Sequence, residues 1–281
     1  MTGERDPRAW WLDDDLMDQF RRRRKTGPSN SSQGWSDRTR GVRVVQPSRT
    51  GLPFNRIFGA SEPPFISTAP KSTSIWHFSE KEISDLTTAT LAFTVALGFM
   101  FSGTLIGALQ NPSAFIVGAL RSLLTLAPAF ILHEIAHKIM AKRYGCWAEF
   151  RADPSGLRFG VILSAITGWV FMAPGAVMVL GKTTVSQFGR IALAGPVTNI
   201  VLWILGAALF LLGEATGLRS NITDMLLQTW MFGNGILALF NMLPFGPLDG
   251  KKIKTWSETV FWIWISISAV TVFLNFTLFS S

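Results

Sequence analysis

Apolar residues gather into six long runs after residue 85 of the chain. Each run holds about 20 residues, the length that an α-helix needs to cross the hydrocarbon core of a bilayer. The runs cover residues 86–109, 114–140, 159–180, 191–212, 225–243 and 260–279. The pattern predicts an all-α polytopic membrane protein with about five to six transmembrane helices.

The third run differs from the others because glycine and proline interrupt it, at Gly168 and at Pro174-Gly175. Basic residues flank it on both sides, so the tendency of lysine and arginine to stay cytoplasmic places both of its ends on one face of the membrane. Irregular backbone survives at membrane depth only when it is buried in protein or lines a wet cavity. We therefore expect a small membrane-inserted β or re-entrant element here, and the sequence leaves its exact path open.

Basic residues also orient the remaining runs. They follow the second run, precede the fourth and follow the fifth, at Lys142, Arg143, Lys182, Arg190, Lys251, Lys252 and Lys254. Between residues 20 and 56 there are ten basic residues and one acid. By the same rule these segments are cytoplasmic, which predicts a cytoplasmic N-terminus and out-and-back pairs of helices.

Composition divides the chain into two parts. Residues 1–80 are rich in arginine, serine, proline and glycine, which predicts a basic, largely disordered cytoplasmic tail, apart from a short amphipathic helix at 9–20. Residues 81–281 form the predicted transmembrane domain. The net charge of +8 could attract nucleic acid or anionic lipid, but its place in the tail favours orientation over nucleic-acid binding. Because no targeting sequence is found, a prokaryotic plasma membrane is the simplest location.

The second run carries a candidate metal site in the sequence His133-Glu134-Ile-Ala-His137. Two histidines four residues apart lie one turn above each other on the same face of a helix, where both can bind one zinc ion. Glu134 beside them can accept a proton from water. These polar groups are costly inside an apolar segment, which favours a functional site over a packing role.

A catalytic zinc ion usually has three protein ligands and one open position. The candidates for the third ligand are Glu149, Asp153, Glu214, Asp224 and Asp249. We expect the first two to be surface or turn residues, and the topology places the next two on the opposite side of the membrane. Asp249 ends the fifth run on the same side as the histidines, after prolines and a glycine that can turn its carboxylate inward.

Two motifs on separate helices resemble the site-2 proteases, a family of zinc-dependent intramembrane metalloproteases. They are His-Glu-Ile-Ala-His at 133–137 and Asn-x-x-Pro-x-x-x-Leu-Asp-Gly at 241–250. Asn199 in Gly-Pro-Val-Thr-Asn and Asn234 fit further family elements, and Ala173–Val177 resembles the family's membrane-inserted β element. The resemblance implies one zinc ion per chain on His133, His137 and Asp249. It also implies Glu134 as general base and Asn241 as a residue that positions substrate or stabilises the oxyanion.

The expected function is hydrolysis of peptide bonds in or near transmembrane helices of membrane-protein substrates, within the bilayer. Two alternatives come from other classes of protein. A non-proteolytic membrane scaffold or chaperone could retain the zinc site for structure, and a metal transporter could use the same groups as a transit site. The transporter would need further polar residues along its spans, of which there are few, mainly Arg121 and Asn275. The sequence does not indicate the oligomeric state.

Overall fold

The computed structural model describes residues 74, 76–172 and 174–279. Most of the predicted tail, including the possible helix at 9–20, lies outside the described residues, so the two-domain division stays a prediction. The helices of the described part are α3 (Glu80–Ser102), α4 (Leu105–Gln110), α5 (Pro112–Arg143), α6 (Pro154–Thr167), α7 (Val185–Thr216), α8 (Asn221–Asn241), α9 (Asp249–Trp256) and α10 (Glu258–Phe279). The strands are β1 (Trp147–Ala152) and β2 (Gly175–Leu180).

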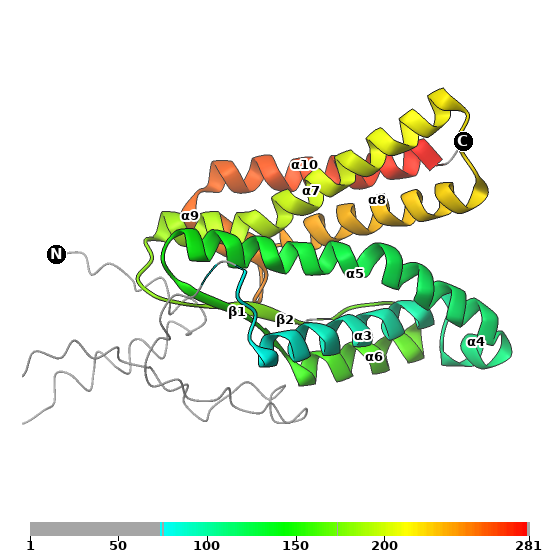
Figure 1. Ribbon diagram of the computed structural model, residues 1–281, viewed down its shortest axis with the longest axis horizontal. Helices are drawn as coiled ribbons and strands as arrows, with labels where there is room; N and C mark the ends of the chain where they lie inside the picture. The colour runs from blue at the N-terminus through cyan, green and yellow to red at the C-terminus, as the bar shows by residue number, and fades with distance from the viewer. Residues whose placement is uncertain (1–73, 75, 173, 280–281) are drawn as a thin grey trace, which may run out of the picture.

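Four of the helices, α3, α5, α7 and α10, are long and apolar enough to cross a membrane. Helix α8 is not among these four, but its 21 residues would extend roughly 31 Å at the usual rise per residue. It follows α7 after a short connection and runs back beside it (Figure 1). The prediction of an all-α polytopic membrane protein with a small β element is confirmed.

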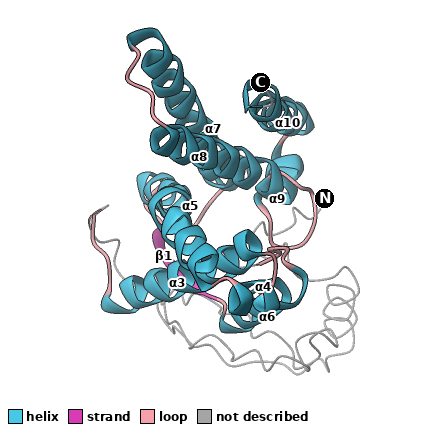
Figure 2. Cartoon of the chain, turned by 90° about the vertical axis from the view of Figure 1, so that its right-hand side faces the viewer, coloured by secondary structure: helices cyan, strands magenta, loops and turns pink. Residues whose placement is uncertain are grey.

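Helix α5 lies between two groups of elements. On one side it packs against α7 and α8, with α9 and α10 beyond them. On its other side lie α3, α6 and the two-stranded sheet (Figure 1, Figure 2). Because α5 carries His133 and His137, this arrangement places the candidate metal site inside the helical assembly.

The first predicted run breaks into two helices. Gly103 has a φ of 93°, a conformation that glycine adopts readily, and it ends α3. Thr104 then caps the first turn of α4 through its side chain. The chain thus reverses direction before α5, which begins with Pro112 after the capping residue Asn111.

The third predicted run is not a crossing helix. Its first part forms α6, which ends at the left-handed Gly168, and its last part forms β2. Strand β2 pairs antiparallel with β1, and Trp147 lies opposite Leu180. The segment therefore returns to the end from which it started, as the charge pattern predicted.

Candidate metal centre

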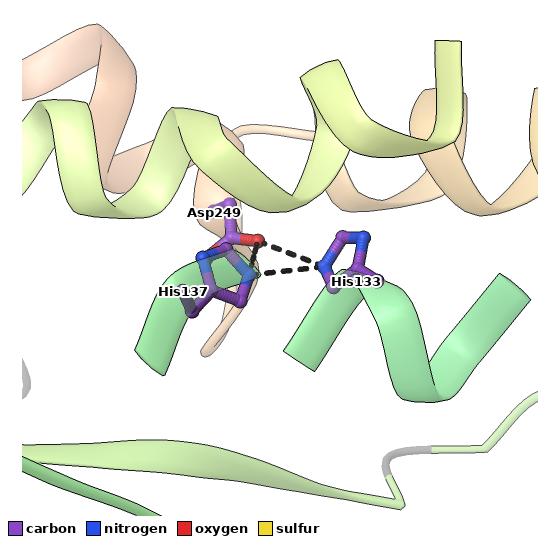
Figure 3. Close-up of side chains that lie close together, drawn as sticks. All are labelled: His133, His137 and Asp249. Atoms are coloured by element: carbon purple, nitrogen blue, oxygen red, sulfur yellow. Dashed lines mark hydrogen bonds and ion pairs between the residues drawn. The ribbon is translucent and has the colours of Figure 1, made fainter. Parts of the chain in front are cut away.

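Three donor atoms from two helices meet at the candidate metal centre. His133 and His137 lie one turn apart on α5, and their Nε2 atoms are 3.0 Å apart. The Oδ2 atom of Asp249 lies 3.4 Å from Nε2 of His133 and 3.0 Å from Nε2 of His137 (Figure 3). All three side chains are buried. Within the part of the chain that the structure describes, this is the one cluster of three His, Cys, Asp or Glu residues that could hold a metal ion.

The connection between α8 and α9 brings Asp249 to the histidines. Helix α8 ends at Asn241, and a turn through Gly246, with a φ of 58°, reverses the chain. Asp249 is the first residue of α9, where a helix N-terminus favours a negative charge. The next residue, Gly250, approaches the carbonyl of Met242 so closely that a Cβ atom would not fit. This tight return aims the carboxylate inward, as the prolines and glycine in the sequence predicted.

The outer nitrogen of each imidazole is held by a hydrogen bond. His137 Nδ1 lies 2.7 Å from the carbonyl oxygen of Ile191, which can only accept, so this nitrogen carries the proton. His133 Nδ1 lies 2.5 Å from Oδ1 of Asn199. An amide oxygen also accepts, so the same tautomer follows for His133. In the neutral form of each imidazole the lone pair is then on Nε2, and both Nε2 atoms face Asp249.

A chain of buried amides fixes the orientation of Asn199. Its Nδ2 donates to the carbonyl of Ala129 at 3.2 Å and to Oδ1 of Asn234 at 2.9 Å. Asn234 in turn donates to the carbonyl of Trp230. Since both partners of Asn199 Nδ2 are acceptors, its amide cannot be flipped without losing both bonds. Helices α5, α7 and α8 thus combine to set the orientation of His133.

Gly195 of α7 leaves room beside the donor atoms. A Cβ atom at this position would contact Nε2 of both His133 and His137. The backbone of α7 therefore covers one side of the centre without placing a side chain against it. The space beside the donors stays clear for an ion.

This donor set fits zinc. Two neutral imidazoles and one carboxylate are a common ligand set for catalytic zinc. Donors bound tetrahedrally at the usual zinc distances lie roughly 3.3 Å apart, and the three atoms here lie 3.0 to 3.4 Å apart. The outer atoms of both histidines are also hydrogen-bonded, as they are in most zinc sites.

Glu134 lies beside this cluster but outside the set of donors. Its side chain is buried, and its carboxylate accepts a hydrogen bond from the backbone N–H of Val177 in β2. The carboxylate is also close enough to His133 and Asp249 for their charges to interact. A buried carboxylate that adjoins the ligands without joining them is well placed to act as a base.

Comparison with known proteins identifies the family. The chain is 38% identical, over 191 residues, to MJ0611 of Methanocaldococcus jannaschii, which is provisionally named a zinc metalloprotease; the match covers 66% of this chain and 90% of that protein. The chain belongs to the site-2 protease family. Rip3 of Mycobacterium tuberculosis, also provisionally named a zinc metalloprotease, is 32% identical over 57% of this chain and 36% of its own length.

A third relative of this site-2 protease family member is YwhC of Bacillus subtilis, whose provisional name is again zinc metalloprotease. It is 31% identical over 46% of this chain and 65% of its own length. No family model matches the chain, and no solved structure matches it significantly. Zinc is the cofactor that these relatives support, and His133, His137 and Asp249 are placed to bind it.

The other candidates for the third ligand lie elsewhere in this member of the family. Asp153 caps α6 through its side chain. Glu214 and Asp224 pair with Arg219 where α7 and α8 join. The expectation that Glu149 is a surface or turn residue was wrong, because it is buried in β1.

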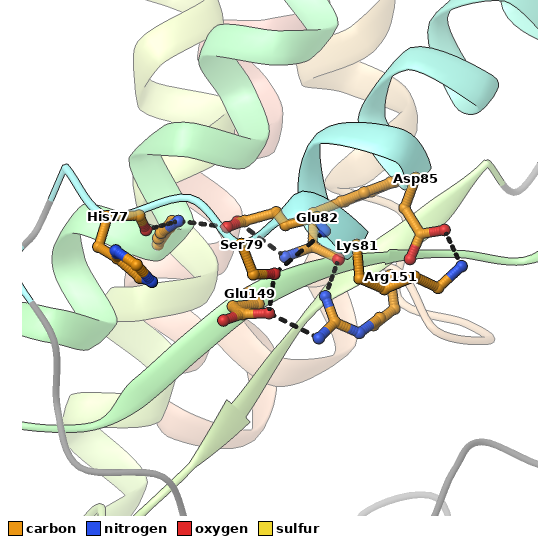
Figure 4. A network of polar contacts seen from close by, with 9 residues as sticks. His77, Ser79, Lys81, Glu82, Asp85, Glu149 and Arg151 are labelled. Atoms are coloured by element: carbon orange, nitrogen blue, oxygen red, sulfur yellow. Dashed lines mark hydrogen bonds and ion pairs between the residues drawn. The ribbon is translucent and has the colours of Figure 1, made fainter.

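Glu149 has a structural environment of its own. Its carboxylate accepts hydrogen bonds from Ser79 at 2.8 Å and from Arg151 at 2.6 Å (Figure 4). Burial alone would raise the pKa of Glu149, but these two donors and the charge of Arg151 outweigh it and hold the pKa below its usual range. Glu149 therefore joins β1 to the residue that precedes α3.

Asn241, the predicted oxyanion residue, lies in the last turn of α8. Its Nδ2 donates to the carbonyl of Leu237 at 2.9 Å, a bond within its own helix. Its catalytic role stays a prediction. Sequence reasoning missed Lys252 as a contact of Asp249. The signal was available, because residues three apart on a helix lie on one face.

Proposed function

We propose that this protein is an intramembrane zinc metalloprotease that hydrolyses peptide bonds in or near transmembrane helices. The observation that carries the proposal is the depth of the metal centre. His133 lies ten residues before the end of α5 at Arg143, which corresponds to roughly 15 Å along the helix axis. Since the hydrocarbon core is about 30 Å thick, this depth would place His133 inside it, with His137 one turn closer to the end of α5.

Zinc, when bound by His133, His137 and Asp249, supplies a Lewis acid that polarises a peptide carbonyl and makes water more acidic. Glu134 accepts the proton from the attacking water and later passes it to the leaving amine. The N–H of Val177 holds the Glu134 carboxylate in place for this transfer. Asn241 is proposed to steady the carbonyl oxygen of the substrate, for which its amide must leave the carbonyl of Leu237.

The open edge of β2 supports a substrate that binds as a strand. Phe150 of β1 donates its backbone N–H to Glu82, so it faces away from β2. In an antiparallel pair, the N–H groups of two opposite residues either both point toward the other strand or both point away from it. Val177 lies opposite Phe150. The N–H of Val177 accordingly points outward, toward Glu134. An unwound segment of a substrate helix could add to this edge beside the catalytic base.

The two edges of the sheet are not equivalent. Glu82 and α3 cover the outer edge of β1, whereas the outer edge of β2 faces α5. Added strands gain affinity from main-chain hydrogen bonds and specificity from side-chain pockets. This favours substrates whose helices contain residues that weaken helical structure, because helical backbone groups are already paired.

The shared position of the basic residues supports the proposed orientation. The C-terminal end of α5, the N-terminal end of α7 and the whole of α9 lie at one end of the molecule (Figure 1). We infer that this end is cytoplasmic, in a prokaryotic plasma membrane. The proposed partners are the lipid bilayer and a membrane protein with a transmembrane helix.

The test is cleavage of a model substrate by the full chain in proteoliposomes. The substrate is a single transmembrane helix with a central Asn-Gly pair, and its matched control has Leu-Leu there. We expect the first substrate to be cut within its apolar segment. Glu134→Gln should lower the rate about 10²- to 10⁴-fold, because the base is lost. Asp153→Asn, a change at the cap of α6, should cleave normally.

A Glu134→Gln variant that cleaves as fast as the wild type would contradict the role of Glu134. Cleavage of a water-soluble unfolded protein, with neither of the two helical substrates cleaved, would contradict the intramembrane assignment. Zinc content should be unchanged in Glu134→Gln, since this side chain is not among the three donors.

A further inference from the structure

The two oxygen atoms of the Asp249 carboxylate have different partners. Oδ2 faces the Nε2 atoms of His133 and His137, at 3.4 and 3.0 Å. Oδ1 faces away from them and accepts a hydrogen bond from Nζ of Lys252 at 2.9 Å. The carboxylate is thus divided between the metal centre and a cation from its own helix.

Lys252 differs from the other lysines of α9. Its side chain is 15% exposed and the Asp249 side chain 7% exposed, so the pair is largely withdrawn from solvent. Lys251 beside it is exposed, and Lys254 lies over the rings of Phe261 and Trp262. Lysine is seldom buried without a charged partner.

Lys252 also approaches the proposed base. Its ammonium group is close enough to the Glu134 carboxylate for the two charges to interact. Its charge therefore acts on two acidic groups of the centre, and it is hydrogen-bonded to one of them, Asp249. The positive charge is part of the centre and not only of the cytoplasmic surface.

We propose that Lys252 is a positioning residue that restrains Asp249 so that a single carboxylate oxygen faces the metal. The proposal rests on the zinc-protease function proposed above. A carboxylate can bind a metal ion through one oxygen or through both. Catalytic zinc needs an open position, and a second carboxylate oxygen would occupy it. By holding Oδ1, Lys252 keeps that position open for water and for the substrate carbonyl.

This role predicts an uncommon combination of effects. Without the ammonium group, Oδ1 is released and can turn toward the metal. The metal should then stay bound while hydrolysis becomes slower. Removal of a ligand, by contrast, should lose the metal itself. Loss of a residue that holds a metal ligand from outside commonly lowers metal affinity or activity by about 10- to 100-fold.

The test replaces Lys252 with methionine, which keeps the length of the side chain without its charge. Lys252→Arg restores a cationic donor, and Lys251→Met is the matched control on the exposed neighbour. The full chain, purified in detergent, is loaded with Co²⁺ in place of zinc, because the visible absorption of Co²⁺ weakens as its coordination number rises. Metal content, thermal unfolding, the Co²⁺ spectrum and the kcat and KM of cleavage are measured for each variant.

We expect Lys252→Met to keep about one metal ion per chain and to unfold at the temperature of Lys251→Met. Its Co²⁺ absorption should be weaker than that of the wild type, and its kcat should be about 10- to 100-fold lower. KM should change by less than about twofold, since substrate binding is not altered. Lys252→Arg should recover both the spectrum and kcat.

Two outcomes would overturn the proposal. An unchanged Co²⁺ spectrum in Lys252→Met would mean that Asp249 needs no restraint, whatever happens to cleavage. Loss of the metal in Lys252→Met would mean that Lys252 is required for metal binding itself, and not for limiting Asp249 to a single oxygen facing the metal. The spectrum does not depend on turnover, so failure of the wild type to cleave would count against the proposed function alone.

Discussion

Each donor of the metal centre is held through an atom that does not face the metal. The carbonyl of Ile191 holds His137, the amide of Asn199 holds His133, and the ammonium of Lys252 holds Asp249. Such contacts fix the tautomer and the direction of a ligand before the metal arrives. The side chains then lose their conformational entropy during folding and not on metal binding, which favours tight binding of the ion.

Asn199 offers a test of this pre-organisation. Asn199→Ala removes the acceptor for His133 Nδ1 and the amide that donates to Asn234 Oδ1 and to the Ala129 carbonyl. We expect zinc affinity to fall about 10- to 100-fold, measured by competition with a chelator of known affinity. Thr198→Ala, at the adjacent position of α7, should bind zinc as the wild type does. Equal affinity in both variants would show that His133 does not depend on Asn199.

The sequence predicts the donors more directly than it predicts the contacts that orient them. The spacing of His133 and His137 sets their shared helix face whatever surrounds them. The partner of Asn199, by contrast, depends on how α7 packs against α5, and a polar residue in an apolar helix has several possible neighbours. Lys252 was interpreted only as an orientation signal, although its spacing of three residues from Asp249 would have predicted the contact once a helix is assumed at this position.

At the scale of elements, the sheet is joined to α3 and α5 by a polar network. Lys138, the residue after His137, is buried and pairs with Glu82. Glu82 also accepts the N–H of Phe150, and Glu149 is bonded to Ser79 and Arg151 (Figure 4). These contacts satisfy buried charges with specific partners. They also hold β1 in place, and through it the strand β2 that faces Glu134.

The pKa of Glu149 predicts a pH dependence of this junction. Since its pKa is held below the usual range, ionised Glu149 contributes stability above its unfolded pKa of about 4.3. That contribution is lost as the pH falls through the lower, folded pKa. Between neutral pH and this acidic range, the wild type should therefore lose more thermal stability than Glu149→Gln.

The measurement is the unfolding temperature of both proteins in detergent across this pH range. Glu80→Gln, at an exposed position of the first turn of α3, serves as the control and should follow the wild type. Parallel curves for the wild type and Glu149→Gln would show that this carboxylate is not coupled to folding.

Hydrophobic runs predicted most of the elements because bilayer length constrains them strongly. The exceptions are informative. The first run ends early at Gly103, whose φ of 93° turns the chain. Strand β1 was missed because its residues Trp147–Ala152 are mixed polar and apolar, and the strand exists only through its pairing with β2 and its contacts with α3. Strand formation depends more on such context than helix formation does.

At the scale of the whole molecule, the metal centre lies where two groups of helices meet along α5. Helices α7 and α9 close it on one side, and the sheet lies on the other (Figure 1, Figure 3). Large exposed apolar side chains, such as Leu120, Leu205 and Phe273, cover the outside of the spans, as contact with lipid requires. The polar machinery is thereby enclosed by protein within an apolar exterior.

The most direct test of this account is the zinc content of the full chain purified in detergent. Wild type is compared with His137→Ala and Asp249→Asn, and Asp153→Asn is the control for a carboxylate outside the centre. We predict about one zinc ion per chain in the wild type and the control, and a loss of most zinc in both ligand variants. No zinc in the wild type, or full retention by Asp249→Asn, would contradict the three-donor centre.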